Sequence, residues 1–203
     1  MPAGPLLVLL GYACGSIPFG VLLARRVAVD VRRAGSGNIG AANVARTAGP
    51  ALGLATLVAD AAKGAVPTLV AGAATGDARV TAAAGLAAFL GHVFPVTLRF
   101  AGGKGVATAL GVLAVLCPLG ALAAVVTFAA VFAAARWVSL ASIAAAATAP
   151  LATAALGCTR AALATAAVMA AVIAVRHRDN VRRLRAGTEP RFRLREKRAA
   201  PEK

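Results

Sequence analysis

Apolar residues fill the chain in long blocks that short polar stretches separate. Seven blocks lie near residues 5–24, 50–75, 80–96, 106–117, 118–135, 138–156 and 161–175. A helix needs about 20 mostly apolar residues to cross a bilayer. Most of the blocks approach that length, and together they hold more apolar residues than one soluble core of this size would bury. The pattern therefore predicts an all-α integral membrane protein with about seven transmembrane helices, some of them short.

Composition supports this prediction and excludes other classes of protein. Of the 203 residues, 60% are apolar and 14% are charged, against about 25% charged residues in an ordinary soluble domain. These figures exclude an intrinsically disordered chain. The net charge of +15 would suggest nucleic acid as the partner of a soluble protein. Here the few aromatic residues do not interleave with the basic ones, so we expect no nucleic-acid partner.

Basic residues are segregated along the chain, and this sets the expected orientation. Arg25, Arg26, Arg32 and Arg33 follow the first block, and 11 of the 22 Lys and Arg residues lie after residue 175. Lys and Arg favour loops on the cytoplasmic side of a membrane. We therefore expect the N-terminus outside and the C-terminus in the cytoplasm.

The stretch 106–135 can be drawn as one long helix or as two helices that meet near Cys117 and Pro118. One helix would place the basic C-terminal region outside, whereas two place it in the cytoplasm, so we favour two. The first of them has about 12 residues and reaches only about 18 Å. We therefore expect the Gly-rich stretch before it to dip below the membrane surface, as irregular backbone does where it lines a wet cavity.

The domain organisation is expected to be simple. Residues 1–203 form a single membrane domain, in which 176–203 is a basic cytoplasmic tail with a flexible end. Cys14, Cys117 and Cys158 all lie in apolar surroundings, and we expect them to be small buried side chains rather than parts of a disulfide scaffold.

The first polar cluster on the expected cytoplasmic face is SGNIGAANVAR at 36–46, and its polar and turn-forming residues are Ser36, Gly37, Asn38, Asn43 and Arg46. A tight turn at Ser36-Gly37-Asn38 can present a hydroxyl and an amide. Asn38, Asn43 and Arg46 can hold oxyanions, and Arg46 can do so through two parallel hydrogen bonds. A capped amphipathic helix at the membrane surface would have the same composition, so this cluster alone leaves both interpretations open.

The second cluster contains Gly102, Gly103, Lys104, Gly105 and Thr108, at the start of the fourth block. Glycines let backbone N–H groups approach an anion, and a helix N-terminus adds partial positive charge. Lys104 adds a full charge and Thr108 a hydroxyl one turn later. The pattern is typical of a phosphate site, although its spacing is not that of a P-loop. A basic loop with packing glycines is an equal alternative.

The third cluster holds His177 and Asn180, which are three residues apart and share a helix face. Ser139 and Ser142 have the same spacing after Arg136, where the sixth block begins. Their hydroxyls could face the same pocket or simply cap the helix.

Asp60 and Lys63 lie inside the second block at the same spacing, where their charges partly compensate each other. We favour a buried structural pair over a catalytic one. The sequence shows no HxxxxD pair, no GxSxG motif, no Cys/His metal set and no nucleotide fingerprint. We therefore expect neither a metal nor a cofactor.

As an ordered set, these clusters resemble the bacterial acyl-phosphate-dependent glycerol-3-phosphate acyltransferase family. The matching stretches are GSIPFG (15–20), SGNIGAANVAR (36–46), DAAKG (60–64), GHVFPVTLRFAGGKGVAT (91–108), RWVSLASI (136–143) and HRDNVRRLRAGTE (177–189). Two residues depart from the family pattern. Ala42 stands where the family usually has Thr, and Ala101 stands where it often has Lys.

The resemblance implies the first acylation of phospholipid synthesis, at the cytoplasmic face of a bacterial inner membrane. A fatty acyl group would pass from acyl phosphate to the 1-hydroxyl of sn-glycerol 3-phosphate, giving lysophosphatidic acid and phosphate. These two substrates and membrane lipid are then the expected partners, no cofactor is required, and a monomer is expected.

The resemblance also implies that Ser36, Lys104, His177 and Asn180 are the catalytic residues. Lys104, Arg46 and the glycine N–H groups would clamp phosphate, while Ser36 and Asn180 would position glycerol 3-phosphate. His177 would orient the substrate or act as the base, and a substrate phosphate oxygen is the competing base. An acylated Ser36 is the third option. A transporter or flippase of an organic phosphate or anionic lipid is the alternative class, because it would use similar cationic clefts.

Overall fold

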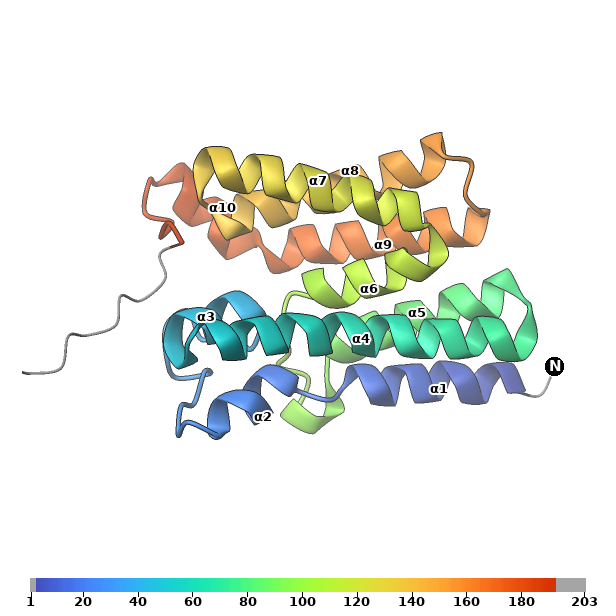
Figure 1. The fold of residues 1–203 in the computed structure, drawn as a ribbon, viewed down its shortest axis with the longest axis horizontal. Coiled ribbons are helices and arrows are strands. Elements are labelled where there is room, and N and C mark those ends of the chain that lie inside the picture. The colour runs from blue at the N-terminus through green and yellow to red at the C-terminus, as the bar shows by residue number, and fades with distance from the viewer. Residues whose placement is uncertain (1–2, 193–203) are drawn as a thin grey trace, which may run out of the picture.

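A computed structural model describes residues 3–192 of the chain, which form ten α-helices, one short 3-10 helix and no strand (Figure 1). The elements are α1 (Ala3–Gly15), α2 (Phe19–Arg25), α3 (Ala41–Ala48), α4 (Pro50–Thr75), α5 (Ala78–Val93), η1 (Val96–Leu98), α6 (Val106–Leu116), α7 (Pro118–Ala135), α8 (Val138–Ala155), α9 (Arg160–Arg176) and α10 (Arg178–Arg185). The predicted all-α fold is confirmed.

The first predicted block is two helices instead of one. Proline has no backbone N–H and disfavours the helical conformation in the residue before it. Pro18 therefore breaks the block, so that α1 ends at Gly15 and α2 begins at Phe19. Together the two helices span 23 residues, which is enough for a single membrane crossing.

The helices differ widely in length. Five helical stretches of the described chain are long and apolar enough to cross a membrane, and α9 with α10 makes a sixth across a bend of 54°. α6 has only 11 residues, or about 16 Å at 1.5 Å per residue. Some helices are therefore short, as expected. The count of seven spans and their orientation stay predictions.

α6 lies between two groups of helices (Figure 1). On one side, α1 packs against α5 and α4; on the other, α7 and α8 form a hairpin that packs against α9. The short helix α6 contacts α4 and α5 in the first group and α7 and α9 in the second. α6 therefore joins the two groups.

Small residues allow this close packing. Ala84 and Ala88 of α5 present their carbonyl groups directly to Gly11 and Gly15 of α1. Gly111 of α6 meets the carbonyl of Ala61 in α4 in the same way. Lipid tails are as apolar as leucine, so helices in a membrane associate through such close backbone contact.

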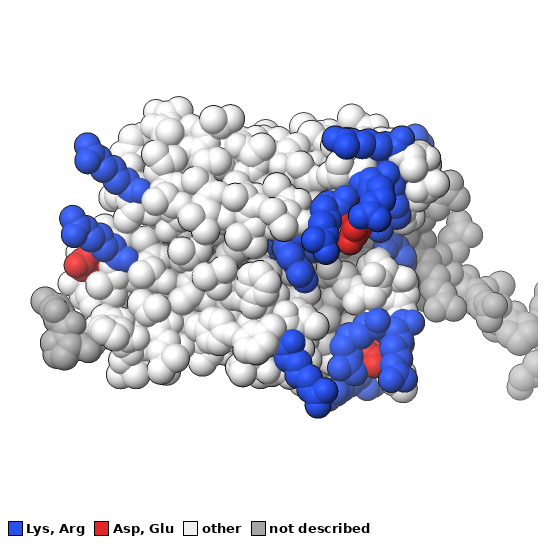
Figure 2. Space-filling model, turned by 180° about the vertical axis from the view of Figure 1, so that it is seen from behind, with Lys and Arg blue, Asp and Glu red and all other residues white. Residues whose placement is uncertain are grey.

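The polar loops and the basic residues gather at one end of the bundle. Figure 1 places α3 and α10 at that end and the N-terminus at the other. Figure 2 shows Lys and Arg side chains crowded at the same end. Arg79 in the first turn of α5 and Arg160 at the start of α9 belong to the opposite end.

The predicted basic tail is in part folded against the bundle. After α10 the chain turns back, and the indole N–H of Trp137 donates a hydrogen bond to the carbonyl of Glu189 at 3.1 Å. The N–H of Phe192 donates to the carbonyl of Arg136 at 2.8 Å. Residues 186–192 therefore form a return segment over the junction of α7 and α8. The flexible end expected for the tail lies outside the described residues.

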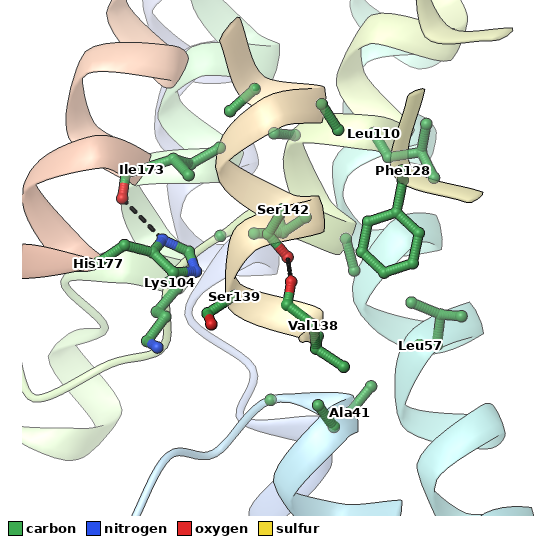
Figure 3. Close-up of a pocket in the computed structure, with 18 of the residues that line it drawn as sticks. Ala41, Leu57, Lys104, Leu110, Phe128, Val138, Ser139, Ser142, Ile173 and His177 are labelled. Atoms are coloured by element: carbon green, nitrogen blue, oxygen red, sulfur yellow. Dashed lines mark hydrogen bonds between the residues drawn. The ribbon is translucent and has the colours of Figure 1, made fainter. Parts of the chain in front are cut away.

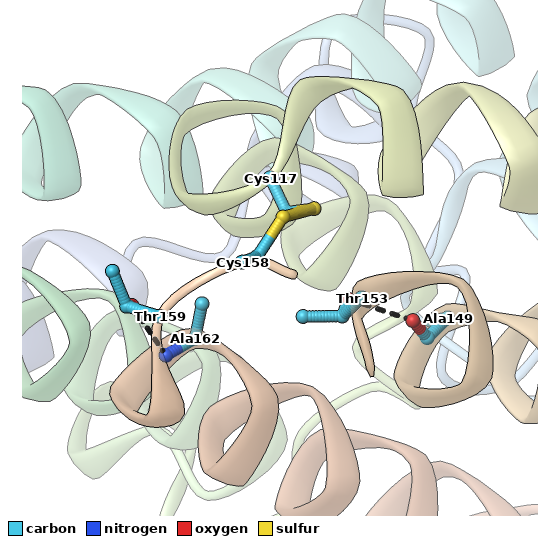
Figure 4. The surroundings of a disulfide bond; sticks show 6 residues. All are labelled: Cys117, Ala149, Thr153, Cys158, Thr159 and Ala162. Atoms are coloured by element: carbon cyan, nitrogen blue, oxygen red, sulfur yellow. Dashed lines mark hydrogen bonds between the residues drawn. A yellow bond between two sulfur atoms is a disulfide. The ribbon is translucent and has the colours of Figure 1, made fainter. Parts of the chain in front are cut away.

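One expectation about the cysteines is wrong. Cys117, between α6 and α7, and Cys158, between α8 and α9, form a disulfide (Figure 4). The two residues are 41 positions apart, and only the packing of α6 beside the α8–α9 turn brings them together. Cys14 is a free, half-buried thiol.

The glycine contacts predict how stability responds to a single added methyl group. We expect Gly111→Ala to lower the free energy of unfolding by about 1–3 kcal/mol, because the new Cβ would collide with the carbonyl of Ala61. Gly4→Ala is the matched control, since its Cβ would meet only Val80 at an ordinary 3.5 Å. Denaturant titration in mixed micelles measures both variants, and equal stabilities would contradict the packing argument.

Candidate active site

Polar residues from several parts of the chain surround one cavity of about 580 Å³. Its polar end is formed by the loop before α3, the α5–α6 loop, the first turn of α8 and the α9–α10 junction. From there it continues as an apolar groove between α6 and the three helices α7, α8 and α9. In Figure 3, Lys104, His177 and Ser139 lie close together, with Phe128 and Leu57 on the other side of the cavity.

Most of the predicted site residues meet in this cavity. Those that line it are Ser36, Asn38, Asn43, Arg46, Lys104, Gly105, Ser139, Ser142, His177 and Asn180. Gly37, Gly102, Gly103 and Thr108 are not part of its wall. Thr108 is buried against Gly64, in the contact between α4 and α6.

Lys104 begins a chain of polar contacts that ends at Glu189. Its ammonium group donates a hydrogen bond to Asn180 Oδ1. Asn180 Nδ2 donates to Glu189 Oε1 at 2.6 Å, and Arg183 Nε donates to Glu189 Oε2 at 2.7 Å. Although burial opposes its charge, these hydrogen bonds hold the pKa of Glu189 below its usual value. The carboxylate thus fixes Asn180, and Asn180 fixes Lys104.

Burial lowers the pKa of Lys104 to about 8. The nearby charges of Arg183 and Arg176 act in the same direction, while Glu189 opposes them. A bound phosphate would place a negative charge beside this ammonium group and so favour its charged form. Lys104 is therefore placed to bind an anion in the cavity.

Asn43 holds the 36–46 loop together. Its Oδ1 accepts the N–H of Ser36 at 2.9 Å, and its Nδ2 donates to the carbonyls of Val31, Ala34 and Asn38 at 2.8–3.1 Å. The amide group is therefore occupied by the loop and shapes it rather than contacting a ligand. The hydroxyl of Ser36 and the side chain of Arg46 have no hydrogen-bond partner within residues 3–192 and border the cavity.

The glycines of the α5–α6 loop allow close packing. A Cβ at Gly103 would collide with His92 Nε2, and one at Gly105, whose φ is +84°, would collide with the ring of Phe89. Arg176 holds the loop from the other side by donating to the carbonyls of Gly102 at 2.8 Å and Gly103 at 3.2 Å. This packing places Gly105 and the N-terminus of α6 at the cavity, where helix N–H groups attract anions.

His177 is oriented by a backbone contact. Its Nδ1 lies 2.8 Å from the carbonyl oxygen of Ile173. A carbonyl only accepts hydrogen bonds, so Nδ1 carries a proton. In the neutral ring, Nε2 then has a lone pair that can accept a proton or a hydrogen bond. Figure 3 places this ring beside Lys104.

The hydroxyls of α8 differ in their contacts. Ser142 donates to the carbonyl of Val138 at 2.7 Å within its own helix. Ser139 lies beside the carboxylate of Glu189 and contributes to its lowered pKa, but the hydroxyl does not meet hydrogen-bond geometry with any described residue. Of the two, Ser139 is the better placed to hydrogen-bond a ligand.

An ion cluster from the interior borders the cavity. Asp60 Oδ1 lies 2.9 Å from Lys63 Nζ and 3.6 Å from His92 Nδ1, and all three side chains are buried. Lys63 also donates to the carbonyl of Ile17 at 2.7 Å, in the break between α1 and α2. The Asp60–Lys63 pair expected from the sequence is present. Its lysine also donates a hydrogen bond to a carbonyl group that the break between α1 and α2 leaves without a helical partner.

Sequence reasoning did not select Glu189, Arg183, Arg176 and His92 as site residues. Their signal was weak: the arginines stood in a run typical of a cytoplasmic membrane anchor, and Glu189 stood beyond the last predicted helix. Within residues 3–192, the structure places no three His, Cys, Asp or Glu side chains close enough to bind a metal together.

Comparison with known proteins gives consistent matches. A family model described as glycerol-3-phosphate acyltransferase matches residues 5–187. A protein of that name from Myxococcus xanthus is 54% identical over 188 residues, which cover 92% of this chain and 98% of the relative. Another from Geobacter sulfurreducens is 50% identical over 187 residues, which cover 92% and 96%.

Two solved structures have the same fold. They are crystal structures of PlsY (YgiH), an integral membrane glycerol 3-phosphate acyltransferase. The glycerol 3-phosphate form is 43% identical, with a TM-score of 0.91 over 94% of this chain and 96% of that one. The lysophosphatidic acid form is 42% identical, with a TM-score of 0.89 over 95% and 96%.

The hydrogen bonds that link Lys104, Asn180 and Glu189 predict that two acidic residues differ in their contribution to stability. We expect Glu189→Gln to destabilise the protein by about 1–3 kcal/mol, because Arg183 and Asn180 would lose a charged acceptor that is only 7% exposed. Asp179→Asn is the control, since its pair with Arg182 is 60–79% exposed and contributes little. Thermal unfolding in detergent compares the two, and equal effects would show that Glu189 fixes nothing.

Proposed function

The chain belongs to the glycerol-3-phosphate acyltransferase family, and from this premise we propose how its cavity performs the transfer. Glycerol 3-phosphate binds at the polar end. An acyl phosphate lies with its phosphate beside Lys104 and its acyl chain in the apolar groove. The observation that carries the proposal is that one cavity joins cationic side chains to a continuous apolar groove.

The polar end supplies the binding groups for both phosphates. Lys104, Arg46 and the N–H groups at the start of α6 bind phosphate oxygens. Ser36 and Asn180 hold the glycerol part so that its 1-hydroxyl faces the acyl carbon. The structure fits these roles, because all four side chains line the same cavity.

The reaction is a direct transfer. The 1-hydroxyl oxygen attacks the acyl carbon, and the bond from that carbon to the phosphate oxygen breaks. Phosphate leaves with the electron pair, and Lys104 stabilises the developing charge. The hydroxyl proton passes either to Nε2 of His177 or to a substrate phosphate oxygen. A mixed anhydride is already activated, so no acylated serine is required.

A monomer in the bacterial inner membrane, with the cavity open to the cytoplasm, completes the proposal. Every residue that lines the cavity belongs to one chain, so a monomer holds a whole site. The crowding of basic residues at the polar end supports a cytoplasmic position (Figure 2). The transporter interpretation is not retained, because the matched relatives and solved structures carry the names of acyltransferases.

The orientation is tested with reporters fused to the two ends of the chain. We expect a C-terminal fusion to behave as cytoplasmic and an N-terminal fusion as external. A C-terminal reporter on the outer side would overturn both the orientation and the count of seven spans.

The acyltransferase proposal is tested on purified protein with labelled acyl phosphate and glycerol 3-phosphate, which should yield lysophosphatidic acid and phosphate. In that assay we expect Lys104→Ala to lower kcat by roughly 10²-fold or more, as the loss of a positioned charge does at an oxyanion. Lys104→Arg should restore little of it, because the two cations differ in shape and reach. Turnover like that of the wild type in Lys104→Ala would leave the loop a purely structural element.

The pKa of Lys104 predicts the alkaline side of the pH profile. Because the pKa is lowered to about 8, the charged form is lost as the pH rises through that value. We therefore expect kcat/KM of the wild type to fall above about pH 8, since kcat/KM reports the free enzyme. The residual activity of Lys104→Arg should not show this fall, because arginine stays charged. A wild-type profile that is flat through pH 9 would contradict the assignment.

Direct transfer predicts that the protein never carries the acyl group. Wild-type protein incubated with acyl phosphate alone should show no added acyl mass in the intact protein, while Ser36→Ala should lose most of its turnover through poor positioning. An acyl adduct on Ser36 that passes to glycerol 3-phosphate at a competent rate would replace this mechanism with a covalent one.

A further inference from the structure

The apolar groove ends at residues that pack against the disulfide. Leu113, Cys117, Ala121 and Ala166 form a buried cluster, against which Leu110, Ala149 and Cys158 pack. Four residues of this set, Leu110, Leu113, Ala149 and Ala166, also line the cavity. The far end of the cavity and the surroundings of Cys117–Cys158 are therefore one structure, which we name the groove floor.

Measured along two helices, the floor lies about 11–15 Å from the polar end. Along α8, the lining runs from Ser139 to Ala149, which is about 15 Å at 1.5 Å per residue. Along α9, it runs from Ile173, next to His177, back to Ala166, which is about 11 Å. A long chain anchored beside Lys104 would therefore reach the floor with its far end.

The disulfide adds a covalent link to the packing of the groove floor. α6 ends at Leu116 and is shorter than its neighbours, and Cys117 lies directly between it and the start of α7. The other residues there are largely alanines, whose small side chains make few contacts. Cys117 is 1% exposed and is bonded to Cys158 in the α8–α9 turn. The disulfide thus joins the end of α6 covalently to the α8–α9 turn beside the floor.

We propose that the Cys117–Cys158 disulfide and the small residues beside it set the longest acyl chain that the enzyme accepts. The inference rests on the proposed function, because it takes the acyl chain of the donor as the occupant of the groove. It assigns to the disulfide a role in substrate selection, in addition to any contribution to stability.

The test compares variants that open and fill the floor. Cys117→Ala with Cys158→Ala removes both sulfur atoms and the bond, and Cys158→Ala alone breaks the bond with less loss of packing. Ala149→Leu fills the floor while the disulfide stays intact. Cys14→Ala is the control for loss of a thiol, and Ala147→Leu, which is exposed on the same helix, is the control for an added leucine.

Each full-length variant is assayed with saturated acyl phosphates of increasing length. One methylene more than a pocket can hold changes kcat/KM by about tenfold or more. For the longest donor relative to the shortest, we expect kcat/KM to rise about tenfold in the opened variants and to fall about tenfold in Ala149→Leu. The two controls should keep the wild-type ratio. In the two controls the shortest donor should react at a wild-type rate.

The outcomes separate the inference from the proposed function. If Ala149→Leu and a folded opened variant both keep the wild-type turnover and the wild-type length profile, the groove floor does not limit the length of the acyl chain. If the length profile changes in Ala149→Leu but folded Cys158→Ala keeps the wild-type profile, the disulfide has no role in selecting chain length. If neither opened variant folds, the ratio of Ala149→Leu to Ala147→Leu decides whether the floor limits chain length. Wild-type protein that turns over no acyl phosphate of any length overturns the proposed function itself.

Discussion

Where the chain leaves the helical conformation near the hydrocarbon layer, its free backbone N–H and C=O groups need hydrogen-bond partners within the protein. The rest of the structure depends on this constraint. The break between α1 and α2 exposes the carbonyl of Ile17, which Lys63 satisfies from α4. Lys63 in turn needs Asp60 to compensate its charge. The irregular α5–α6 loop is held in the same way, because Arg176 donates to two of its carbonyls and the N–H of Gly103 donates to that of His92. Charged residues inside the bundle are thus tied to irregular backbone.

The short length of α6 follows from the same loop. Because the α5–α6 loop occupies part of the bundle near the polar end, α6 starts deep and covers only part of the neighbouring helices (Figure 1). Its first residues lie at the cavity, and its other face packs on α4 through glycine contacts. One helix therefore presents its N-terminus to the cavity, forms a wall of the apolar groove and joins the two helix groups.

Much of this arrangement could be predicted from the sequence, because local patterns carry it. Apolar blocks predicted the helices, and the glycines around Lys104 predicted a loop beside a helix start. Asn43 was predicted as a ligand, but sequence alone does not show that three carbonyls occupy its amide. Glu189 and the Cys117–Cys158 bond depend on contacts between distant segments. Such pairings follow from how helices pack, and no short motif records them.

The return segment has a consequence for biosynthesis. The site combines the loop at Ser36 with Glu189, the residue that fixes Asn180 and Lys104. Helices of a membrane protein enter the bilayer in order as the ribosome makes them, and domains form from the N-terminal side. A nascent chain that has inserted α1 to α9 therefore still lacks the carboxylate that completes the polar end. The polar end is therefore completed only at the last stage of synthesis, and a chain terminated before Glu189 lacks the contact that fixes Asn180 beside Lys104.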